Sequence, residues 1–173
     1  SQLRLPTMNK LWEDVAVDAQ DRGWSYPQYL YTLCDYEAAE RHRRRLARHI
    51  AEAHLPRGKT LESYDFSAIT GVTKSKMLGL STGDLWVKEG MNVLIFGRSG
   101  LGKTHLAAAI GEKLVMNGFR VFFSRTTELV QRLQVAKKGL TLPSMLEKLD
   151  KYDCLILDDF AYVRKDEFET SVL

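Results

Sequence analysis

The chain has 173 residues, of which 45% are hydrophobic and 27% charged, and its formal net charge is +3. This length suits one domain with a small additional piece, and the composition is ordinary for a globular protein. No stretch approaches the roughly 18 apolar residues of a membrane span, and the amino terminus has no apolar signal core. We therefore expect a cytoplasmic protein without membrane association. The cysteines and histidines show no zinc-ligand spacing, which predicts no structural metal.

Residues 1–58 predict an all-helical amino-terminal module. A first helix is expected over 8–22. Ser25 is a candidate cap for a second helix, which should run to about Ala53. The Pro-Arg-Gly segment at 56–58 then marks a boundary. Cys34 on this second helix and Cys154 further on are expected to be small core residues.

A basic stripe is the main feature of the second helix. Four arginines fall on one helical face at i, i+3, i+4 and i+7: Arg41, Arg44, Arg45 and Arg48. Small and apolar residues fall on the opposite face: Ala39, Leu46, Ile50 and Ala53. Residues 41–59 contain seven basic residues and one acid. Such a face suits a phosphate backbone and predicts binding of double-stranded DNA without sequence preference.

The same stripe has a second interpretation, as a solvated or partner-binding surface. Glu37 and Glu40 precede Arg41 and Arg44 by four residues and can pair with them. No aromatic residues alternate with the arginines, so base stacking is not expected.

The segment after the boundary gives weaker signals. Lys74 to Leu80 is expected to form a short helix. Leu61, Tyr64 and Phe66 are apolar positions in an extended stretch. They either contact an adenine base or fill the core, and the second interpretation is favoured.

Residues 97–104 form a complete phosphate-loop motif, G-x-x-x-x-G-K-[ST]. An apolar strand is expected before it, at 92–96, and a helix after it, at 105–116. The expected nucleotide-binding residues are Gly97, Arg98, Ser99, Gly100, Leu101, Gly102, Lys103, Thr104 and His105. Backbone amides and the helix N-terminus would hold phosphate, Lys103 would reach the β and γ phosphates, and Thr104 would bind Mg²⁺. The alternative is a tightly packed glycine turn that binds nothing.

Two carboxylates supply the second half of the expected site. Asp158 and Asp159 follow the apolar run 154–157, at the carboxyl end of an expected strand. Asp158 would hold Mg²⁺ through water, and Asp159 would act with Lys103 in catalysis by orienting or deprotonating water. A solvated strand end is the alternative.

The order of elements predicts the fold class. Strands are expected at 92–96, 120–124 and 154–158, with helices to about Lys138 and over 143–151 between the last two. Alternation of strands and helices implies an α/β fold with a parallel sheet flanked by helices. The α/β domain would occupy 59–173.

Together, the Arg-rich front helices, the segment LESYDF at 61–66, the loop GRSGLGKT with the following HLA, and LILDD at 155–159 resemble the IstB-type helper ATPases of insertion-sequence transposition. They are also similar to the DnaC-type helicase loaders, and both groups belong to the AAA+ P-loop class. The resemblance implies binding of ATP and Mg²⁺, assembly as a homo-oligomer on DNA, and engagement of a transposase. It matches Asp158 to the metal-site aspartate and the front helices to the DNA- and partner-contacting region.

Two departures from the family pattern matter. Family members often have Glu at the position of Asp159, whose side chain is one methylene shorter. The family also continues past LILDD with a further internal strand and an arginine that reaches a neighbour's γ phosphate. We therefore expect that the carboxyl-terminal part of the AAA+ core is missing and that this chain binds nucleotide but hydrolyses it poorly. A helicase loader, or a nucleic-acid- or transposase-binding fragment with little ATPase activity, are the competing interpretations.

Overall fold

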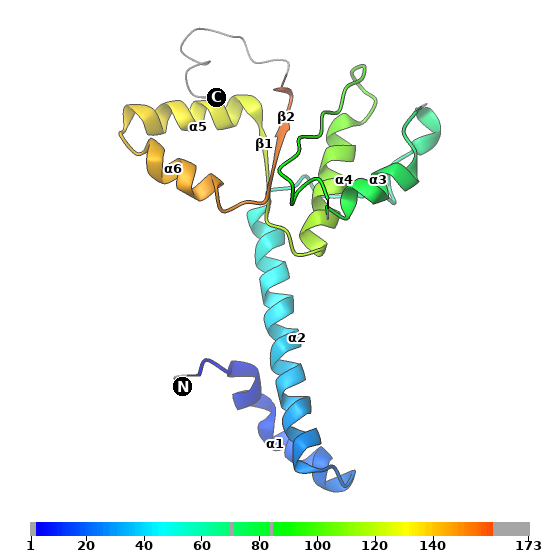
Figure 1. The fold of residues 1–173 in the computed structure, drawn as a ribbon, viewed down its shortest axis with the longest axis vertical. Coiled ribbons are helices and arrows are strands. Elements are labelled where there is room, and N and C mark those ends of the chain that lie inside the picture. The colour runs from blue at the N-terminus through cyan, green and yellow to red at the C-terminus, as the bar shows by residue number, and fades with distance from the viewer. Residues whose placement is uncertain (1–2, 70, 84, 161–173) are drawn as a thin grey trace. The chain divides into compact units, whose positions relative to one another are not determined.

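The computed structural model describes residues 3–69, 71–83 and 85–160, and its contacts divide the chain into two units (Figure 1). The first unit comprises Ser1–Arg48 and the second His49–Leu173. The domain boundary expected near residue 58 stays a prediction. Each unit is described by itself below.

The first unit is a helical hairpin. Helix α1 spans Pro6–Asp21 and helix α2 spans Tyr26–Glu52, close to the expected bounds. Proline at the start of α1 suits a position whose N–H has no helical partner. Val15 and Ala19 of α1 are buried, as is Leu33 of α2. The amide of Gln28 lies 3.4 Å from Ser25 Oγ, at the predicted start of α2.

Glu37 ties the two helices together. Helix α1 lacks a side-chain cap of its own, and the amides of Thr7 and Met8 instead donate to Glu37 Oε2 at 2.8 and 3.0 Å. A carboxylate at a helix N-terminus satisfies free donors and complements the helix dipole. Arg41 Nε donates to Glu37 Oε1 at 2.9 Å, and Arg41 Nη2 donates to the Arg4 carbonyl at 2.6 Å. The buried carboxylate is therefore fully partnered.

The expected apolar face of α2 is wrong in part. Ala39 is exposed and Ile50 is 49% exposed, whereas Ala53 is fully buried. Positions 33, 37, 41, 44 and 48 follow one helical stripe, because they are separated by three or four residues. The face of α2 that carries Leu33 and Glu37 beside α1 is therefore the same face that carries Arg41, Arg44 and Arg48 further along the helix.

The cysteines are both free among the described residues. Cys154 is half-buried, and burial raises the pKa of its thiol to about 11. Cys34 is exposed, so its assignment to the core is wrong. It directly follows buried Leu33, and one helical residue turns a side chain by about 100°.

The second unit contains the α/β elements. After a 3-10 turn at Phe66–Ala68 come α3 (Lys74–Ser81), α4 (Lys103–Met116), β1 (Val121–Arg125), α5 (Thr126–Lys138), α6 (Leu142–Leu149) and β2 (Cys154–Asp158). Strands β1 and β2 pair in parallel, with Val121 opposite Cys154 and Arg125 opposite Asp158. Helix α4 and the pair α5–α6 lie on opposite sides of these strands in Figure 1. The predicted α/β class with helices flanking a parallel sheet is confirmed.

The strand expected at 92–96 is absent from the described residues. Residues 91–99 have no regular secondary structure, and Leu94 and Phe96 are 73% and 85% exposed. A strand requires a neighbour for its backbone N–H and C=O groups. In the described part of the chain the sheet contains β1 and β2 alone, and neither strand pairs with residues 92–96 along its open edge. The apolar run therefore has no β-sheet hydrogen bonds to a neighbouring strand.

Helix α4 packs closely on the sheet because of Gly111. A Cβ atom at this position would lie 2.6 Å from Ile156 Cδ1 of β2 and 3.0 Å from Leu55 Cδ2. Leu106, Ala109 and Leu114 of the same helix are also buried. This contact fixes the start of α4 relative to the end of β2.

Within the described residues, no helix has the length and hydropathy needed to cross a membrane.

We predict that the hairpin loses stability in acid through Glu37. Burial raises the pKa of Glu37, but hydrogen bonds from Met8, Arg41 and Thr7 lower it further, so the net pKa lies below its usual range. Ionised Glu37 therefore stabilises the hairpin at neutral pH, and this stabilisation is lost as the pH falls below about 4.3 toward the folded-state pKa. The protection factors of residues 5–21 against hydrogen exchange, corrected for the intrinsic pH dependence of exchange, should fall through this window.

The Glu37→Gln variant should exchange faster than wild type at pH 7 and show a weaker acid dependence in these residues. Glu13→Gln, on the exposed side of α1, is the matched control. Equal exchange in the Glu37 and Glu13 variants at pH 7 would contradict the capping role.

Candidate nucleotide-binding site

The phosphate loop connects the extended run to α4. Gly100 and Gly102 have φ angles of +83° and +77°, which favour glycine because other side chains are strained there. Helix α4 begins at Lys103, directly after Gly102. The loop thus ends at a helix N-terminus, where free N–H groups and the helix dipole favour an anion.

Lys103 lies over the start of the loop. Its Nζ donates to the carbonyls of Gly97 and Arg98 at 2.9 and 3.0 Å. These acceptors are neutral, so the ammonium charge is not compensated by a carboxylate in these contacts. It is therefore available to a phosphate, the role that the sequence predicts.

The side chains of Thr104 and Asp158 are in contact at the carboxyl end of β2. Thr104 Oγ1 lies 3.0 and 2.9 Å from the two carboxylate oxygens of Asp158, although 54 residues separate them in the chain. Thr104 is on the first turn of α4 and Asp158 is the last residue of β2. The structure therefore brings together the two side chains that the sequence assigned to Mg²⁺.

The end of β2 has a support that the sequence analysis missed. Thr126, fully buried at the start of α5, donates its hydroxyl to the Asp158 carbonyl at 2.8 Å. No sequence pattern connects Thr126 with Asp158, because 32 residues separate the two positions. Thr126 thus fixes the backbone that carries the Asp158 carboxylate.

Asp159 follows in a different environment. It is exposed and has a φ angle of +56°, a conformation that aspartate tolerates better than most residues. No contact in the described residues links it to Lys103 or Thr104. Its role in catalysis stays a prediction.

A second missed group is the support beneath the loop. Tyr64 is 9% exposed and donates its hydroxyl to the Leu101 carbonyl at 2.7 Å. Leu61 and Tyr64 pack with Leu106 and Ala109, so the interpretation of the 61–66 segment as core is favoured over adenine contact. The sequence signal was the apolar spacing alone, which gives no hint of the hydroxyl's partner.

His105 points toward this support. Its Nε2 lies 2.9 Å from the Thr60 carbonyl and 3.2 Å from Ser63 Oγ. The imidazole also meets the Tyr64 ring edge-on at 5.2 Å. The structure therefore connects the His105 side chain to residues 60–64, while its expected contribution to nucleotide binding stays a prediction.

The donor set fits Mg²⁺ together with a phosphate chain. Mg²⁺ prefers oxygen ligands and is commonly held by one or two protein groups, with water and substrate phosphates completing the shell. Thr104 and Asp158 supply such oxygens, and no group of three or more acidic, His or Cys residues competes for a cation in the part of the chain described. When bound, Mg²⁺ would neutralise phosphate charge beside Thr104.

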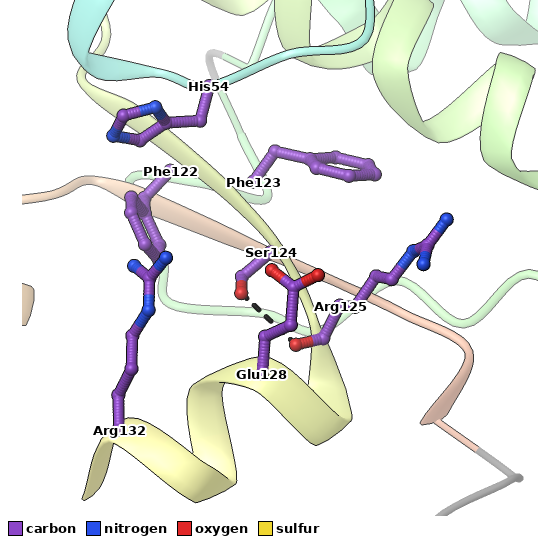
Figure 2. Close-up of a pocket in the computed structure, with 7 residues that line it drawn as sticks. All are labelled: His54, Phe122, Phe123, Ser124, Arg125, Glu128 and Arg132. Carbon is purple, nitrogen blue, oxygen red and sulfur yellow. Dashed lines mark hydrogen bonds between the residues drawn. The ribbon is translucent and has the colours of Figure 1, made fainter.

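A separate cavity of about 470 Å³ lies beside β1 and α5 (Figure 2). Its lining combines aromatic and charged side chains: His54, Phe122, Phe123, Ser124, Arg125, Glu128 and Arg132. His54 meets Phe122 edge-on at 5.7 Å. None of these residues belongs to the phosphate loop, so the cavity is distinct from the candidate site.

The arginines of the predicted DNA face are exposed but differ in their partners. Arg41 pairs with Glu37, and Arg44 shares Glu40 with Arg43 at 2.8 and 2.7 Å. Hydrogen bonds from Arg43 and Arg44 lower the pKa of Glu40 to about 2. Arg45 Nη2 lies 3.3 Å from His42 Nδ1. The predicted i,i+4 pairs are present, so part of the stripe's charge is compensated.

The glycine-rich loop is followed by Lys103 and Thr104 at the start of a helix, and Asp158 lies at the end of a strand beside it. This arrangement is typical of the P-loop class of nucleotide-binding proteins. The model of the IstB-like ATP binding protein family matches residues 1–173, and the chain belongs to this family. The resemblance expected from the sequence is confirmed.

Three relatives illustrate the match. The chain is 54% identical over 173 residues to the insertion sequence ATP-binding protein y4iQ/y4nD/y4sD of Sinorhizobium fredii, covering all of this chain and 58% of that protein. It is 32% identical to the IS21 ATP-binding protein of Pseudomonas aeruginosa, over 99% of this chain and 64% of that one. It is 31% identical to the IS5376 ATP-binding protein of Geobacillus stearothermophilus, over 95% and 65%. The chain thus spans less than two thirds of these curated relatives.

We predict that two glycines of the loop respond unequally to alanine. Gly100→Ala should cost about 1 kcal/mol of unfolding free energy, because it strains only the backbone. Gly102→Ala should cost at least twice as much, because its Cβ would also lie 2.8 Å from Tyr64 Cε2. Thermal and urea unfolding of both variants would measure the difference. Equal losses would show that the Tyr64 ring does not limit Gly102.

Proposed function

We propose that this chain binds Mg-ATP in the loop 97–104 and assists DNA transposition, as a homo-oligomer that binds double-stranded DNA and engages a transposase. The observation that supports it most is the meeting of Thr104 and Asp158 beside the loop, at 2.9–3.0 Å. A hydroxyl and a carboxylate at this position suit a metal-bound phosphate chain. The relatives' names, as insertion sequence ATP-binding proteins, favour transposition over helicase loading.

Hydrolysis is the finer part of this proposal. Asp158 would orient a metal-bound water, and the exposed Asp159 beside it would position or deprotonate the attacking water. Lys103 would stabilise negative charge on the transferred phosphoryl group. All three groups lie at the carboxyl end of β2 or the start of α4, the edge where open α/β sheets bind ligands.

DNA binding is proposed for the exposed arginines of α2. The side chain of Arg48 makes no ion pair or hydrogen bond to another described residue, and that of Arg45 has only the contact to His42. Arg43 and Arg44 share a single carboxylate. The positive charge of the face therefore exceeds its internal compensation, which supports binding of phosphate.

We predict that Lys103→Ala weakens Mg-ATP binding by roughly 10- to 100-fold, because a charged hydrogen bond contributes about 1.5–3 kcal/mol. Asp158→Asn should reduce the gain in ATP affinity that Mg²⁺ provides, since the amide is a weaker metal ligand. Isothermal titration with ATP, with and without Mg²⁺, measures both effects. Lys148→Ala, at an exposed position of α6, is the control and should bind as wild type does. Wild-type protein that gives no Mg²⁺-dependent heat would contradict the proposal.

We predict that replacing Arg44, Arg45 and Arg48 by alanine weakens duplex DNA binding and lowers the salt slope by about 2–3, since each phosphate contact contributes roughly 0.9. Fluorescence anisotropy over a salt series provides the measurement. A variant with Lys74, Lys76 and Lys148 replaced by alanine loses the same charge elsewhere and controls for net charge. If both triple variants behave alike, the arginines form only a solvated face.

A further inference from the structure

One peptide group lies at the centre of the phosphate loop, between Leu101 and Gly102. Gly102, which follows this peptide bond, and Gly100, which precedes Leu101, both have positive φ angles. Backbone of this kind is permissive, because glycine populates several conformations at similar cost. A loop that presents its amides in one direction therefore needs a contact that selects one conformation.

Tyr64 makes such a contact. Its hydroxyl donates to the Leu101 carbonyl at 2.7 Å. In a planar trans peptide, the carbonyl and the next N–H point in opposite directions, and the chain has no cis peptide bond among the described residues. Holding the Leu101 oxygen toward Tyr64 therefore turns the Gly102 N–H away from Tyr64.

We propose that Tyr64 is a positioning residue for the phosphate loop: it aims the Gly102 amide, and with it the start of α4, at the phosphates of the nucleotide. This inference rests on the proposed nucleotide binding at the same loop. Tyr64 itself does not contact the nucleotide. It reduces the conformational freedom that the loop would otherwise lose on binding, which improves affinity by preorganisation.

The ring of Tyr64 supplies a second restraint. A Cβ atom at Gly102 would lie 2.8 Å from Tyr64 Cε2 and 3.5 Å from the hydroxyl oxygen. The ring therefore lies directly against the backbone of Gly102. The hydroxyl thus contacts the Leu101 carbonyl, and the ring occupies the space beside Gly102 that a side chain would need.

Tyr64 can impose this geometry because it is itself held in place. The residue is 9% exposed and packs with Leu61, Leu106 and Ala109. Its ring meets Phe66 at 4.8 Å and His105 at 5.2 Å, both edge-on. His105 in turn contacts the Thr60 carbonyl and Ser63 Oγ. The support and the helix that follows the loop thus form one packed group.

The test removes the hydroxyl and keeps the ring. Tyr64→Phe should weaken binding of both Mg-ATP and Mg-ADP by about threefold to tenfold, because one hydrogen bond contributes roughly 0.5–1.5 kcal/mol. The unfolding midpoint of the nucleotide-free protein should also fall modestly, because the same hydrogen bond stabilises the fold. Tyr152→Phe is the matched control, because Tyr152 packs with Phe122 and Arg120, away from the loop. Unchanged affinity in Tyr64→Phe would overturn the proposal.

A readout without nucleotide separates this inference from the proposed function. In nucleotide-free protein, the amide resonances of Gly102 and Lys103 should shift or broaden in Tyr64→Phe and stay in place in Tyr152→Phe. If wild type binds no nucleotide, the proposed function fails, and unchanged Gly102 resonances in Tyr64→Phe would overturn the positioning role independently. If Tyr64→Phe does not fold, the wild-type protein provides the test. A nuclear Overhauser effect between the Tyr64 ring and Gly102 Hα would support the positioning role, and its absence would overturn it.

Discussion

The contact of Thr104 with Asp158 is the constraint on which the candidate site depends. It joins the first turn of α4 to the last residue of β2, at 2.9–3.0 Å. Two features bring these elements together: Gly111 lets α4 approach Ile156 closely, and the Thr126 hydroxyl holds the Asp158 carbonyl. The Thr104 hydroxyl and the Asp158 carboxylate also provide two oxygen ligands of the kind that Mg²⁺ prefers. The packing of the helix on the sheet therefore determines the chemistry of the site.

Sequence patterns predicted those helices and strands that are specified by residues within or next to the segment itself. The helices α1, α2, α3 and α5 follow from periodicity and end signals, and β1 and β2 are apolar runs flanked by polar residues. Parallel pairing followed from the helices between the strands. The run at 92–96 shows the limit, because an apolar, β-branched segment becomes a strand only when another strand offers its backbone groups. Strand formation at 92–96 thus depends on a neighbour that local sequence does not reveal.

The candidate site was predicted in its residue types and only partly in its connections. Lys103, Thr104 and Asp158 could be named because the loop motif and the strand end carry recognisable chemistry. Tyr64 and Thr126 could not, since their function depends on a partner 37 or 32 residues away. A hydroxyl that supports the backbone leaves no motif in the sequence. The pairing of Glu37 with Arg41 was predicted, but its capping of α1 was not, because that contact also joins residues about 30 apart.

The arginine stripe shows how one pattern serves two roles along a helix. Toward the start of α2 the stripe packs on α1 through Leu33 and Glu37, and there the carboxylate uses Arg41 to balance its charge. Further along, Glu40 is divided between Arg43 and Arg44, and Arg48 has no such partner within the described chain. Compensation therefore decreases along the helix, from a structural ion pair to an uncompensated positive surface. In the proposed complex with DNA, the phosphate backbone would be attracted most strongly toward Arg48, because arginines already paired with carboxylates add little to the local positive potential.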